Sequence, residues 1–190
     1  MNTKKYLSYH MDFSNVYTGK LDKYGGLPTH LPPVWPTEER WGDRLTFLCQ
    51  LYCDDLKLSL PNTLCLQIYQ LVIDGEEGSD PCIIQVPLGA KLNTQKEGIS
   101  HPYIQEGDII FEEVWEEVNE QSVQDEFESE NGIYLLKNKL KGWFNIGEIT
   151  TDKFLGLIMD GNVFSPFNWG CGYNLVIYLD KGGKVVWDFI

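Results

Sequence analysis

The feature that most constrains the fold is a series of short apolar runs, each rich in β-branched or aromatic residues and bounded by turn formers. The clearest two close the chain, where residues 173–180 (YNLVIYLD) and 184–190 (KVVWDFI) flank Gly182 and Gly183. Glycine can adopt positive φ, so this pattern predicts a β-hairpin. Further strands are predicted at residues 45–52, 64–73, 82–86, 133–137 and 154–159. With few candidates for long helices, we expect a mainly β chain.

Length and composition predict one globular domain over residues 1–190. The chain has 190 residues, 43% of them hydrophobic, which is enough to bury a sizeable core. No run approaches the roughly 20 apolar residues of a membrane span, and the first residues lack the apolar stretch of a secretory signal. Cys49 and Cys65, two of the five cysteines, lie in apolar runs, where a reduced cysteine behaves as a small hydrophobe. We therefore expect a cytoplasmic protein with no disulfide bonds and no membrane contact.

The charge is concentrated in one block. Fifteen Lys and Arg against 28 Asp and Glu give a net charge of −13, and Glu106 to Glu130 contain acids but neither Lys nor Arg. Such a chain is repelled by nucleic-acid phosphates and attracts basic partners. Within the block, apolar residues recur at spacings of three and four: Phe111, Val114, Trp115 and Val118. This spacing fits an amphipathic helix with an acidic outer face, although residues 106–112 fit a strand equally well.

Two parts of the chain resemble each other. The segments KYGGLP, LTFLCQLY and LCLQIYQ, beginning at residues 23, 45 and 64, are followed in the same order by KLKGWF, KFLGLIM and YNLVIYL, beginning at 139, 153 and 173. This order predicts an internal duplication, with halves 1–105 and 131–190 joined by the acidic segment 106–130.

The segment KYGGLPTHLPPVWP (23–36) holds a double glycine and four prolines. A phosphate-binding loop is disfavoured, because the prolines block the helix that such a loop needs. A PxxP ligand for an SH3-like groove is a second interpretation. The simplest interpretation is a stiff structural clasp that turns at Gly25 and Gly26 and uses Leu27 and Trp35 to cover one end of a sheet.

These residues also carry a family resemblance. A double glycine and a proline, then a Trp-Pro pair, then a strand that ends in glutamine resemble the YwqG-like family, a bacterial family of unknown function; the matching residues are Gly25, Gly26, Pro28, Trp35, Pro36 and Gln50. The closing segments NWGCGYNLVIYL and KVVWDF are similar to that family as well. The resemblance implies a compact α+β, strand-dominated fold of antiparallel sheets with an internal duplication, and no established activity.

The chain departs from the family pattern in two places. Some relatives carry paired cysteines before the glutamine-ending strand, whereas this chain has TEERWGDR there, which gives no support for a zinc knuckle. The second copy of the glycine-glycine-proline element reads Lys141, Gly142, Trp143 and Phe144. Any site that depends on symmetry between the two copies is therefore in question.

No catalytic signature, metal site or cofactor site is predicted. Cys49 and Cys53 lack a second close pair of ligands, and the three histidines show no metal-ligand spacing. Ser100 next to His101 lacks the second glycine of a nucleophile elbow, so a turn is the better interpretation. The dense carboxylates of the acidic block are typical of a solvated face or of a surface for a basic partner.

Two hypotheses for function follow. The first is a non-enzymatic interaction protein, in concrete form an immunity-type inhibitor of a cationic bacterial toxin, in which Trp115 is an apolar anchor beside the acids Glu112, Glu113, Glu116, Glu117 and Glu120. The second is a small-ligand binder or enzyme with a pocket between the two β-rich halves, lined by Trp35, Trp143 and Trp169.

Overall fold

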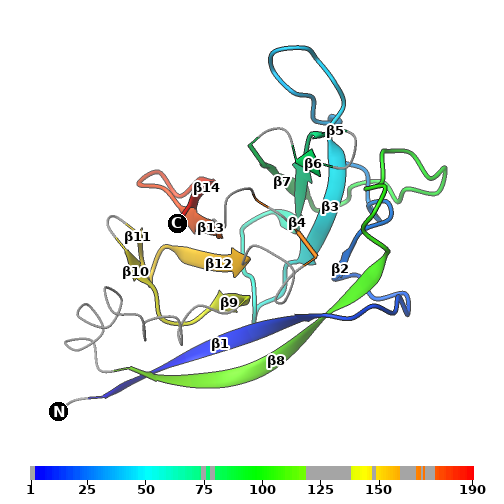
Figure 1. Cartoon of the computed structure of the whole chain (residues 1–190). Helices are drawn as coiled ribbons and strands as arrows, with labels where there is room; N and C mark the ends of the chain where they lie inside the picture. The colour runs from blue at the N-terminus through cyan, green and yellow to red at the C-terminus, as the bar shows by residue number, and fades with distance from the viewer. Residues whose placement is uncertain are drawn as a thin grey trace.

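The computed structural model describes residues 3–73, 76–77, 80–118, 138–146, 149–158, 166–167, 169 and 174–190. Regular structure in this part of the chain is β-strand alone (Figure 1). The strands are β1 (Lys4–Phe13), β2 (Lys23–Tyr24), β3 (Thr46–Tyr52), β4 (Thr63–Gln70), β5 (Val72–Ile73), β6 (Glu76–Glu77), β7 (Cys82–Pro87), β8 (Gly107–Val118), β9 (Lys139–Lys141), β10 (Asn145–Ile146), β11 (Ile149–Thr150), β12 (Phe154–Ile158), β13 (Leu175–Leu179) and β14 (Val185–Phe189). The expected α+β class is therefore wrong, and the fold is mostly β.

Ten of these strands form one antiparallel sheet. Their order is β14-β13-β12-β9-β1-β8-β2-β3-β4-β7, and β14 also contacts β7. The sheet therefore curls until its two edges meet and is nearly closed, which protects backbone groups that an open edge would expose. The described pairs β5–β6 and β10–β11 are short ladders outside it.

The long strands β1 and β8 lie side by side at the centre of this sheet (Figure 1). Beyond β8 follow β2, β3, β4 and β7, which we call the first arm. Beyond β1 follow β9, β12, β13 and β14, which we call the second arm. The N-terminal strand thus joins the arm that is built from the C-terminal part of the chain.

The two arms repeat one cross-strand register. In the first arm, Cys49 pairs with Tyr24 on one side and with Ile68 on the other. In the second arm, Gly156 pairs in the same way with Leu140 and Ile177. The register shifts at the same place in both arms, after Phe47 in β3 and after Phe154 in β12. Residues of the two arms can therefore be matched: Lys23 with Lys139, Gly26 with Gly142, and Gln50 with Leu157. The segments that resemble each other in sequence lie on these matching strands.

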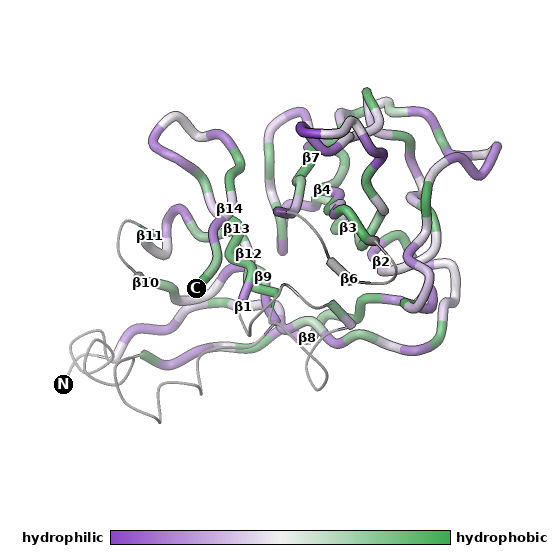
Figure 2. The backbone as a smooth tube through the Cα atoms, turned by 45° about the horizontal axis from the view of Figure 1, so that its top comes forward, coloured by the Kyte–Doolittle hydropathy of each residue, from purple (hydrophilic) through white to green (hydrophobic). Residues whose placement is uncertain are grey.

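The main core contains residues of both arms and of the central pair. Leu51 and Leu66 of the first arm belong to the same buried cluster as Ile158 and Ile177 of the second. Figure 2 shows hydrophobic and hydrophilic residues along β1 and β8, as expected for strands whose successive side chains face opposite sides. Among the described residues, no helix has the length and apolarity of a membrane span.

Most strands predicted from local pattern are confirmed. The C-terminal hairpin is formed by β13 and β14, and Gly183 in its turn has φ 77°. Predicted strands also correspond to β3, β4, β7 and β12. The strand predicted at 133–137 lies outside the described residues.

Candidate functional site

The first part of the acidic block is a strand, not a helix. Strand β8 pairs with β1 from Ile109, opposite Phe13, to Val118, opposite Lys4. In a strand, alternate residues share a face, so the helical grouping of the apolar residues does not apply. Glu112 and Glu116 therefore face one side of the sheet, whereas Glu113 and Trp115 face the other.

Glu116 is a structural residue. Its carboxylate lies 2.8 Å from the Lys139 ammonium and accepts a hydrogen bond of 2.8 Å from the backbone N–H of Trp143. The Lys139 side chain is 1% exposed and the Glu116 side chain 8%. Burial lowers the pKa of Lys139, and the Glu116 carboxylate opposes that shift. These contacts hold the Glu116 carboxylate inside the protein, so it is not available to a binding partner.

A row of exposed side chains remains on the other face of β8. It consists of Glu113, Trp115 and Glu117, and the Trp115 side chain is 58% exposed. Glu117 lies 2.6 Å from Lys5 of β1, and both side chains are mostly in solvent. We call these three residues the β8 row. Glu112 is exposed on the opposite face, and Glu120 lies outside the described residues.

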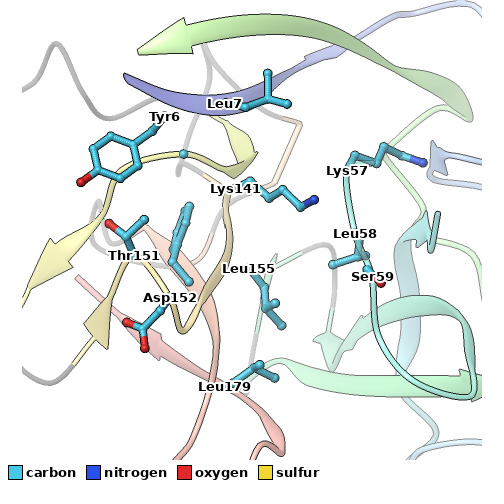
Figure 3. A pocket seen from close by; sticks show the side chains of 12 residues that line it. Tyr6, Leu7, Lys57, Leu58, Ser59, Lys141, Thr151, Asp152, Leu155 and Leu179 are labelled. Atoms are coloured by element: carbon cyan, nitrogen blue, oxygen red, sulfur yellow. The ribbon is translucent and has the colours of Figure 1, made fainter. Parts of the chain in front are cut away.

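A cavity of about 360 Å³ lies next to this row, between the two arms (Figure 3). Leu7, which pairs with Trp115 across the strands, lines it together with Leu58 from the β3–β4 connection. Leu155 and Leu179 of the second arm form its other apolar wall. Leu7 therefore connects the β8 row to the cavity, because it pairs with Trp115 and also lines the cavity.

The two lysines of this cavity are already engaged. Lys57 lies 3.2 Å from the Asp22 carboxylate, donates to the Tyr52 carbonyl at 3.0 Å and also bonds Asp54. Lys141 donates to the backbone carbonyl of Leu56. Beside these engaged lysines, the cavity offers a partner its apolar side chains and the carboxylate of Asp152.

The three tryptophans expected around a pocket between the halves do not line this cavity. Trp35 packs edge-on against Tyr69, with ring centroids 5.3 Å apart. Trp143 is buried with Val118, and Trp169 belongs to the main core beside Phe167. The tryptophans were predicted from their residue type alone, and their positions depend on contacts distant in sequence.

The segment around the glycine pair has the geometry of a clasp. Gly25 and Gly26 have φ of 62° and 61°, and a Cβ on either would lie 2.6 Å from an atom of the Gln105–Glu106 segment. Buried Gln50 accepts a hydrogen bond of 2.9 Å from the Thr29 N–H and donates to the Leu21 carbonyl at 2.6 Å. Gln50, expected to end its strand, lies within β3, which continues to Tyr52, and its side chain bonds residues on both sides of the turn.

The Trp-Pro pair extends this clasp. Trp35 donates to the Leu45 carbonyl at 2.9 Å, and the Leu45 N–H donates back to the Pro36 carbonyl at 2.9 Å. Gly98 is required here because a Cβ would lie 2.3 Å from the Trp35 ring. Pro28, buried within the segment, also lines a second cavity together with Gly26.

The remaining sequence candidates have structural surroundings. Burial raises the pKa of Cys53 to about 11 and also raises the pKa of Cys49, so neither is a reactive thiolate. The His101 Nδ1 accepts the N–H groups of Tyr103 and Ile104, both at 3.1 Å, as in a turn. In the described ranges no three His, Cys, Asp or Glu side chains come together as a metal site would require.

Comparison of the chain with models of known protein families found no match, and comparison with curated protein sequences found none either.

Proposed function

We propose that the chain is a non-enzymatic protein that binds a basic partner protein through the β8 row and the adjoining cavity. The observation that carries this proposal is the exposed Trp115 between Glu113 and Glu117, on one face of β8, the longest strand among the described residues. Tryptophan is enriched among the residues that dominate binding energy, and flanking carboxylates favour a cationic partner. The cavity lined by Leu7 would receive an apolar side chain of that partner.

The charge of the whole chain supports this choice of partner. A net charge of −13 accelerates encounter with a basic protein and disfavours nucleic acid. In its concrete form, the protein is an immunity-type inhibitor that covers the basic cleft of a bacterial toxin. We place it in the cytoplasm, where the four free cysteines of the described part, Cys49, Cys53, Cys65 and Cys82, would stay reduced.

The test compares binding by a variant of the β8 row and by a control variant, both of which replace an exposed tryptophan. The triple variant Glu113→Gln/Trp115→Ala/Glu117→Gln removes the row, whereas Glu39→Gln/Trp41→Ala changes an equally exposed acid and tryptophan elsewhere. A basic protein captured from the native host at low salt is purified, and its association and dissociation rates are measured with each variant.

We expect a complex of equal stoichiometry with the wild type and the control. The triple variant should bind at least about a hundredfold more weakly, and wild-type association should slow as salt is raised. Equal binding by the triple variant, or a captured partner that is acidic, would reject the proposal.

A further inference from the structure

The second cavity, of about 540 Å³, is lined by Gly26 and by residues that follow it in the chain, next to the first arm. Its walls include Leu27, Pro28 and Leu92, and its charged lining residues are Lys23, Lys96 and Glu106. This volume lies within the roughly 300–1,000 Å³ that small-molecule sites occupy. It is separate from the β8 row, because none of its lining residues lies on β8 or β1.

Lys23 is the unusual group in this cavity. It is a lysine with 4% exposure whose ammonium contacts the Oε1 atom of Glu106 and lies 4.8 Å from the centre of the Tyr17 ring. An ammonium carries three N–H donors. Within the described part of the chain its hydrogen-bond acceptor is that one carboxylate oxygen. A buried ammonium with donors to spare favours a ligand that brings acceptor oxygens.

The second arm shows what the same position looks like when it is closed. Lys139, which matches Lys23, is 1% exposed and donates both to Glu116 and, at 3.1 Å, to the Trp143 carbonyl. Trp143 follows Gly142 and is itself buried, whereas Leu27 follows Gly26 in the first arm and lines the cavity. In the second arm, groups of the protein accept two hydrogen bonds from Lys139. In the first arm, the ion pair of Lys23 and Glu106 lies at the wall of a cavity.

The acidic partners also differ between the arms. Glu106 directly precedes Gly107, which pairs with Tyr24. In the second arm Ser8 directly precedes Tyr9, which pairs with Leu140, so Ser8 occupies the position that matches Glu106. In the second arm the carboxylate comes instead from Glu116 on the next strand. Glu106 belongs to the cavity lining, and its side chain is 34% exposed, so a ligand can reach it.

We propose that this cavity binds a small zwitterion of the α-amino acid type. Its carboxylate would accept from Lys23, and its ammonium would donate to Glu106. Glu106 would repel a simple anion, and Lys23 and Lys96 would repel a simple cation, whereas a zwitterion meets charges of both signs with charge-assisted hydrogen bonds. The apolar walls around Leu27 and Leu92 would then contact the side chain of the amino acid.

The probes are the individual standard amino acids and their N-acetyl amides, which lack both charges, titrated into the full chain by calorimetry. Lys23→Met and Glu106→Gln each remove one charge, and Thr94→Trp narrows the cavity while leaving the ion pair intact. Lys184→Met and Glu39→Gln carry the same charge changes at exposed positions. Each variant is first checked for the wild-type circular dichroism spectrum.

We expect at least one free amino acid to bind, its N-acetyl amide not to bind, and affinity to fall by at least about tenfold in all three cavity variants but in neither control. If Lys23→Met fails to fold, Thr94→Trp and Glu106→Gln still decide the matter. The proposal is overturned if no free amino acid binds, if the blocked analogues bind equally well, or if the cavity variants keep wild-type affinity.

Discussion

At the scale of single residues, neighbouring glutamates of β8 have opposite roles. Glu116 is buried against Lys139, whereas Glu117, one position along the strand, lies in solvent beside Lys5. Removing one member of a buried pair leaves the other charge without compensation in a site that water cannot reach. An exposed pair loses little when broken, because water and salt already screen it.

Glu116→Gln should therefore lower the free energy of unfolding by about 3 kcal/mol or more, because it leaves the Lys139 ammonium buried with an amide in place of its carboxylate. The measurement is urea unfolding followed by circular dichroism. The matched control Glu117→Gln breaks the exposed pair and should change stability little.

Adding Lys139→Met to Glu116→Gln should recover part of the loss, because the uncompensated charge is then gone. Two single losses that simply add in the double variant would show that the two side chains do not act as a pair. Equal effects of Glu116→Gln and Glu117→Gln would contradict the burial described for Glu116.

At the scale of elements, local pattern predicted the strands that carry their own signal. Strands β3, β4, β13 and β14 are dense in apolar and aromatic residues between turn formers, so their type was readable from short windows. Strand β8 was ambiguous, because Phe111, Val114 and Trp115 fit a helix as well. Its conformation is decided by β1, whose matching residues lie about a hundred positions away, and no local window contains that information.

The candidate site was predictable to a similar extent. Glu113 and Trp115, both exposed, were singled out by the density of acids and the lone tryptophan among them. The burial of Glu116 was not, because Lys139 lies 23 positions further along the chain. The cavity around Lys23 was also missed, although the unusual run of glycine and proline did mark the segment that forms its wall.

Asp180, in the turn between β13 and β14, should make the stability of the protein depend on pH. Asp180 accepts the N–H groups of Lys184 at 2.9 Å and Gly182 at 2.8 Å, and these bonds lower the pKa of its carboxyl group. A lowered pKa means that the stabilisation is present above the carboxyl pKa of the unfolded chain, about 3.9, and is lost as pH falls through the folded pKa.

Asp180→Ala should therefore destabilise the protein clearly at pH 7 and progressively less as the solution is acidified below about pH 4. Urea midpoints of wild type and variant across that range provide the measurement. Asp180→Asn keeps an acceptor oxygen without titrating, so the difference between the Asn and Ala variants should not depend on pH. A wild-type advantage over Asp180→Ala that grows in acid would refute the assignment.

At the scale of the whole molecule, the sheet order prevents the two arms from being independent. The N-terminal strand β1 pairs with β9 of the second arm, and β8, which precedes that arm in the chain, pairs with β2 of the first. The two arms also share one buried cluster, which contains Leu51 of β3 and Ile158 of β12. Each arm thus borders a strand from outside its own stretch of the chain, and neither buries its apolar face alone.

Unfolding should accordingly be cooperative across both arms. Leu51→Ala, in the first arm, creates a cavity at a site with 0% exposure and should cost about 3 kcal/mol. Native-state hydrogen exchange should show that loss in the most protected amides of β12 and β13 as well as in those of β3 and β4, because all of them exchange through the same global opening. If the loss were confined to β3 and β4, the arms would open separately, and the shared core and crossed strands would not couple them.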